Sequence, residues 1–155
     1  MNTEPASTEN SAPNIAIERI RAGLLISLLG LVILIFGAKP EWFGWDRSPV
    51  VGFIQITAIL IGLALICLGG TTGLAALWGE QEKSISADIG LRLVSTGYVI
   101  SVFSGMADVF GMSVQQSAKT PFFGPWQAAG MQLGMIIIAI GMLMIVPYKH
   151  ISKNK

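Results

Sequence analysis

Long apolar runs alternate with short polar segments along the chain. Four runs contain almost no charged residue, and they cover Ala22–Ala38, Val50–Trp78, Ile89–Met112 and Trp126–Val146. A helix rises about 1.5 Å per residue, so about 20 apolar residues cross a hydrocarbon core about 30 Å thick. All four runs are near or above that length. The pattern predicts an all-α fold, a bundle of four transmembrane helices.

A buried soluble four-helix bundle is the alternative, and it would need a polar face on every helix. The segments Leu28–Phe36 and Met135–Val146 have no such face. Hydrophobic residues make up 52% of the chain and charged residues 12%, the latter about half the share in a typical soluble domain. We therefore expect an integral membrane protein surrounded by lipids.

The spans define the expected domain organisation. Residues 1–14 are rich in Ser, Thr, Asn, Pro and Glu, which is typical of a disordered tail. Residues 15–148 form the four-helix transmembrane domain, and residues 149–155 form a basic tail.

Seven of the ten Lys and Arg residues fall on one side of the predicted membrane: Arg19, Arg21, Lys83, Arg92, Lys149, Lys153 and Lys155. The positive-inside rule places that side in the cytoplasm. We expect a multi-pass protein of the cell's inner (plasma) membrane with both termini cytoplasmic.

Aromatic residues gather in the two predicted outer loops. Trp42, Phe43 and Trp45 lie in the first loop, and Trp126 follows the second. Such rings favour the headgroup level, so we interpret them as interfacial anchors.

Both outer loops contain Lys, Pro and Phe-Gly with a Trp in the loop or directly after it, and each precedes a helix with Gln in its first turns, Gln55 in one case and Gln127 and Gln132 in the other. Arg21 and Arg92 lie near the inner starts of the first and third helices. These similarities indicate two tandem helical hairpins in the same orientation. Whether the hairpins are a true repeat stays open at this point.

The third predicted helix is the polar one. Asp88 and Arg92 are four residues apart near its start, a spacing that favours an interfacial salt bridge. Asp108 lies near the outer end, and Tyr98 lies between. Asp108 is a candidate proton-accepting or cation-binding carboxylate, or else an end-of-helix residue held by backbone amides or by Lys119.

Small residues at spacings of three and four let helices approach closely. The third helix has such a stripe in Gly97, Ser101 and Gly105, which we predict to be buried against another helix. Gly130 and Gly134 give the fourth helix a GxxxG pair.

Gly69, Gly70 and Gly73 surround two threonines near the end of the second helix. Because Gly weakens a helix, this helix either bends there or continues to Trp78.

Candidate chemistry is scarce. The only His, His150, lies in the tail, and the only Cys, Cys67, lies in an apolar run. Haem, chlorophyll, iron–sulfur and zinc sites lack their ligands within this chain. We predict no cofactor, no metal, no nucleic-acid partner and no catalysis by the chain alone.

Three segments, Phe43–Gln55, Ala87–Val99 and Phe122–Gly130, together resemble small four-helix membrane proteins of filamentous phototrophic bacteria and their relatives. The similarity covers about Ile15–Tyr148. Because such organisms build large membrane electron-transfer assemblies, the resemblance implies an accessory subunit, for instance of alternative complex III.

Three hypotheses for function follow. The first is a cofactor-free accessory subunit of a larger membrane electron-transfer complex. The second is a small homo-oligomeric transporter or channel that uses the polar third helix. The third is a contributor to a quinone or proton site through Asp108, Tyr98 or Arg92.

Overall fold

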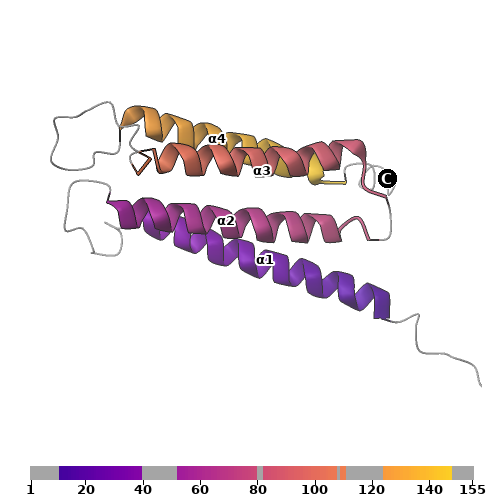
Figure 1. Ribbon diagram of the computed structural model, residues 1–155. Helices are drawn as coiled ribbons and strands as arrows, with labels where there is room; N and C mark the ends of the chain where they lie inside the picture. Colours follow the sequence, from indigo (N-terminus) through magenta and orange to yellow (C-terminus); the bar gives the residue numbers. More distant parts are fainter. Residues whose placement is uncertain (1–10, 40–51, 80–81, 108, 111–123, 148–155) are drawn as a thin grey trace, which may run out of the picture.

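The computed structural model describes residues 11–39, 52–79, 82–107, 109–110 and 124–147. The helices in this part of the chain are α1 (Ser11–Ala38), α2 (Phe53–Ala76), α3 (Ile85–Gly105) and α4 (Pro125–Ile145). The predicted all-α fold with four helices is confirmed. α1 packs against α2, α3 packs against α4, and the two antiparallel pairs lie side by side (Figure 1).

Each helix holds a segment long and apolar enough to cross a membrane: Ala16–Ala38, Phe53–Ala76, Ile85–Gly105 and Pro125–Ile145. The shortest two have 21 residues, which is about 31 Å of helix at about 1.5 Å per residue and matches a hydrocarbon core of about 30 Å. The protein is therefore a multi-pass membrane protein.

α1 begins earlier than the sequence predicts. The expected tail extends through residue 14, whereas the helix begins at Ser11. Pro13 lies in the first turn, where backbone N–H groups have no acceptor within the helix, so its missing N–H breaks no hydrogen bond. Residues 11–14 are thus helical.

α2 runs through its glycines as one continuous helix and ends two residues before Trp78. The Thr71 hydroxyl donates to the Cys67 carbonyl at 2.7 Å, and the Thr72 hydroxyl donates to the Leu68 carbonyl at 2.7 Å. These bonds satisfy both hydroxyls inside an apolar segment.

Glycines set the distance between α1 and α2. A Cβ placed on Gly30 would lie 2.6 Å from the Gly62 carbonyl oxygen, and one placed on Gly62 would lie 2.7 Å from the Gly30 carbonyl oxygen. Gly23 and Gly69 meet in the same reciprocal way, at 2.7 Å and 2.6 Å. The hydrogen in place of each Cβ therefore points at a carbonyl of the facing helix, the arrangement of a Cα–H···O contact.

The α3–α4 pair is built in the same way. A Cβ on Gly90 would lie 2.6 Å from the Gly141 carbonyl oxygen, and one on Gly97 would lie 2.7 Å from the Gly134 carbonyl oxygen. The reverse approaches are as close. In both hairpins the glycine pairs are seven residues apart along each helix, which is about two turns.

The two hairpins therefore share one packing register. Gly62 and Gly69 of α2 lie 72 positions before Gly134 and Gly141 of α4. The same spacing relates the two helix starts, where the Gly52 N–H donates to Gln55 Oε1 at 2.8 Å and the Gly124 N–H donates to Gln127 Oε1 at 2.9 Å.

The register also relates α1 to α3. Gly23 and Gly30 lie 67 positions before Gly90 and Gly97. In this register Arg92 corresponds to Leu25. The sequence suggests instead that Arg92 corresponds to Arg21, which lies four residues, or about one turn, before Leu25. The repeat thus lies in how the helices pack, and the charged residues do not follow it.

The hairpins meet through α2. Within the described residues no Cα of α1 lies within 8 Å of a Cα in α3 or α4, whereas α2 approaches both. Leu63 and Cys67 pack with Val94, Ile138 and Ile145. A second apolar cluster, nearer the start of α2, contains Ile56, Leu60 and Met131.

Among the described residues, a hydrogen bond joins the hairpins at the opposite end of α2. Trp78 Nε1 donates to the Ile145 carbonyl at 2.9 Å. This carbonyl belongs to the last turn of α4, where carbonyls lack a partner within the helix. The indole therefore caps α4 from the other hairpin.

Gly62→Ala should destabilise the protein by about 1–3 kcal/mol more than Gly70→Ala, because its Cβ meets backbone that cannot move aside. Both positions lie inside α2 and gain the same helix propensity. The Cβ at Gly70 would meet the flexible end of Met142 at 2.9 Å and would lie at an ordinary contact distance of 3.9 Å from Ser27 Oγ. Unfolding by dodecyl sulfate in mixed micelles measures both variants, and equal losses would contradict glycine-limited packing.

Trp78→Phe should lower the free energy of unfolding by about 0.5–1.5 kcal/mol, since the ring stays and the donor to Ile145 is lost. Trp126→Phe is the matched control because Trp126 is 89% exposed. The same micelle titration compares them, and a loss at Trp126 as large as at Trp78 would contradict the capping role.

Candidate functional site

The predicted stripe of small residues on α3 lies inside the bundle. Gly97 and Gly105 are buried, and Ser101 has no exposed surface. Gly97 faces Gly134, whereas a Cβ on Gly105 would meet Met131 Sδ at 3.2 Å. This face of α3 is therefore occupied by helix packing.

Ser101 is the buried polar residue of the described core. Its hydroxyl donates to the Gly97 carbonyl at 3.0 Å and lies 3.5 Å from the Met131 carbonyl of α4. A Cβ on Gly134 would strike this hydroxyl, and Gly130 is packed against Ser104 in the same way. The hydroxyls thus fill the space that the glycines of α4 leave.

A second set of polar side chains points out of the bundle. Asp88, Arg92, Ser95 and Thr96 are all exposed, and their spacing of three and four residues places them along one side of the helix. We call these four residues the outer face of α3. Ser95 lies ten residues after Ile85, about 15 Å along the axis, so the outer face reaches the middle of the span.

The predicted ion pair forms on this face. Arg92 Nη2 lies 3.2 Å from Asp88 Oδ2, and the two side chains are 81% and 58% exposed. An exposed pair of this kind contributes about 0–1 kcal/mol to folding in water. The pair therefore does not explain why two charges occupy the first turns of a span.

The hydroxyls above the ion pair are satisfied by their own helix. Ser95 donates to the Leu91 carbonyl at 3.2 Å, and Thr96 donates to the Arg92 carbonyl at 2.9 Å. Hydroxyl oxygens keep free lone pairs after donating. The outer face can therefore still accept hydrogen bonds from a neighbouring protein.

Tyr98 belongs to neither set. It is half-buried and packs against the apolar cluster of Leu63 and Cys67. Six residues on a helix correspond to about 240° of rotation, so Tyr98 and Arg92 occupy different faces. The structure brings Asp88 and Arg92 together and leaves Tyr98 apart. Asp108 lies outside the described residues.

Metal ligands do not gather in the part of the chain that the structure describes, since no group of three or more His, Cys, Asp or Glu comes together there. Cys67 is a buried free thiol. Of the predicted anchors, Trp126 stands exposed in the first turn of α4. Trp42, Phe43 and Trp45 lie outside the described residues.

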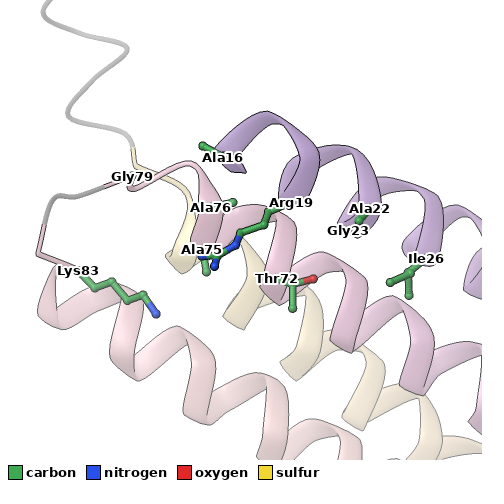
Figure 2. Close-up of a pocket in the computed structure, with 10 residues that line it drawn as sticks. All are labelled: Ala16, Arg19, Ala22, Gly23, Ile26, Thr72, Ala75, Ala76, Gly79 and Lys83. Carbon is green, nitrogen blue, oxygen red and sulfur yellow. The ribbon is translucent and has the colours of Figure 1, made fainter. Parts of the chain in front are cut away.

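The sequence does not single out one further feature, a pocket between the start of α1, the end of α2 and the segment that precedes α3 (Figure 2). Arg19 and Lys83 both line it. They are 64 positions apart, so only the folded helices bring them together. The one signal in the sequence is that small residues surround Arg19 at helical spacing, as Ala16, Ala22 and Gly23.

Neither a protein family nor a curated protein nor a solved structure matches the chain.

Ser101→Val should lower the free energy of unfolding by about 1–3 kcal/mol, because a branched side chain at a fully buried position overpacks the α3–α4 contact. Ser95→Val makes the same change on the outer face and should stay within about 0.5 kcal/mol. Micelle unfolding titrations compare the two, and an equal response would show that α3 has no preferred inner face.

Proposed function

We propose that this protein is a cofactor-free accessory subunit that docks in the membrane against another subunit through the outer face of α3. The observation that carries the proposal is that Asp88, Arg92, Ser95 and Thr96 point away from their own bundle. Ionisable residues within membrane spans nearly always face protein or water, because lipid solvates them poorly. A neighbouring subunit would supply that surrounding.

The interior of the chain supports the same assignment. The buried small residues are in contact with facing helices, and the buried Ser101 hydroxyl has its acceptors. The bundle therefore uses its inner surfaces to hold itself together. The outer face is a polar surface that remains for a partner protein, while the exposed apolar side chains of α1, such as Leu24 and Leu28, suit lipid.

The resemblance to small membrane proteins of filamentous phototrophic bacteria supports an electron-transfer assembly as the host, for instance alternative complex III. The charge distribution supports a plasma-membrane location with both termini cytoplasmic, since Arg19 and Lys83 line one pocket at the same end of the bundle (Figure 2) and Arg21 follows Arg19 by two residues.

A homo-oligomeric transporter or channel is the second candidate. The observation in its favour is the same outer face, because several copies that brought it together would line a polar path from the ion pair to Thr96. In that arrangement the neighbour of α3 is another copy of α3, which an experiment can distinguish from a different polypeptide.

Cross-linking from α3 in intact membranes tests the proposal. A photoreactive amino acid at position Ser95 should form an adduct with a different membrane polypeptide. The same group at Leu28, which is 56% exposed near the middle of α1, should label lipid. The reason is that only the outer face is covered by protein.

Mass spectrometry of the adduct decides between the outcomes. A partner that belongs to a redox complex supports the electron-transfer host. A partner outside any redox complex overturns that part of the proposal. Adducts with a second copy favour the transporter or channel, and lipid adducts from both positions overturn the docking role.

A further inference from the structure

The pocket near Arg19 has a volume of about 750 Å³. The pocket exists because α1 packs against α2 and, within the described residues, does not pack against α3 or α4. Lys83, which lies just before α3, lines one side of the pocket (Figure 2).

Small and apolar residues form the walls. From α1 these are Ala16, Ala22, Gly23 and Ile26, and from α2 they include Ala75 and Ala76. Because these side chains are small, they leave open space beside the two helices.

Both charged groups of the lining are cations. Figure 2 shows Arg19 extending from α1 towards Ala75 of α2, with Lys83, which lies just before α3, on the other side of the pocket. No acidic side chain lines the described pocket. The third polar side chain, Thr72, donates its hydroxyl to its own helix, so the described lining residues carry a positive charge.

The charges and the apolar walls lie at different depths. Arg19 is in the first turn of the Ala16–Ala38 span, and Ile26 lies seven residues further, about 10 Å along the axis. The cations therefore lie at the headgroup level and Ile26 lies within the hydrocarbon region. This is the order of groups in a phospholipid, an anionic phosphate followed by acyl chains.

We propose that this pocket binds one anionic phospholipid, with its phosphate held between Arg19 and Lys83 and an acyl chain lying along Ala22 and Ile26. A guanidinium and an ammonium donate charge-assisted hydrogen bonds to phosphate oxygens. Basic pockets between transmembrane helices are a recognised form of headgroup site. The site is separate from the outer face of α3.

Native mass spectrometry and thermal unfolding of the purified full chain in neutral detergent test the site. Dioleoyl phosphatidylglycerol should bind and raise the melting temperature. Dioleoyl phosphatidylcholine, which has a zwitterionic headgroup, should bind at least about fivefold more weakly. Glycerol 3-phosphate has no chain to bury and should give no shift at the same concentration.

Charge variants locate the binding. Arg19→Gln and Lys83→Gln should each weaken phosphatidylglycerol binding about fivefold, the effect of roughly 1 kcal/mol per cation near an anionic lipid. Arg21→Gln removes the same charge from an exposed position two residues away that does not line the pocket, and it should leave the affinity unchanged.

A variant that fills the pocket tests the contribution of the acyl chain to lipid binding separately from that of the headgroup. Ala22→Phe places a large side chain at an exposed position of the lining, so it should reduce lipid binding while every charge and the fold remain. Leu25→Phe, on the exposed surface outside the pocket, is its control.

Three results would overturn the proposal. One is an equal loss in Arg21→Gln and Arg19→Gln, which would reflect net charge alone. Another is equal binding of both phospholipids. The third is stabilisation by glycerol 3-phosphate equal to that by phosphatidylglycerol, which would make the pocket a site for a free phosphate ester.

Discussion

The close approach of backbone to backbone at the glycine pairs is the contact on which the rest of the structure depends. In lipid, apolar side chains gain nothing by leaving the solvent, so helices associate through van der Waals contact and polar contacts between them. Gly30 with Gly62, and Gly97 with Gly134, bring carbonyl oxygens against the facing helix. Each hairpin is thereby fixed in one register, and large side chains such as Val94 and Ile138 pack beside the glycines of the facing helix.

The two hairpins contact each other less closely than the two helices within each hairpin do. The apolar clusters between them depend on branched and flexible side chains such as Leu63, Ile138 and Met131, which hold the helices further apart than glycine does. The Trp78 indole adds one directional bond at one end of this junction. The tight contacts lie within hairpins, and the adaptable ones lie between them.

Hydropathy alone was sufficient to predict the four spans. A single apolar segment of about 20 residues satisfies its backbone hydrogen bonds in lipid by forming a helix. The stripe through Gly97, Ser101 and Gly105 could be read from its spacing, and so could the Asp88–Arg92 pair. The contacts of Gly23 and Gly30 with α2 could not be predicted in this way. A GxxxG search compares glycines four residues apart in one helix, whereas these glycines are seven residues apart and their register depends on two helices. The Arg19–Lys83 pocket depends on two segments that are distant in sequence, and the early start of α1 depends on where Pro13 falls within the first turn.

The confinement of α1 to α2 has a consequence for biosynthesis. All close packing of the first hairpin is complete within the residues up to Gly79, before any of α3 is needed. Contacts between neighbouring segments form fast because little chain entropy is lost in closing them. The ribosome can therefore deliver a finished hairpin to the bilayer while the second is still being translated. The second hairpin then folds through contacts between its own two helices and docks onto α2 of the first hairpin.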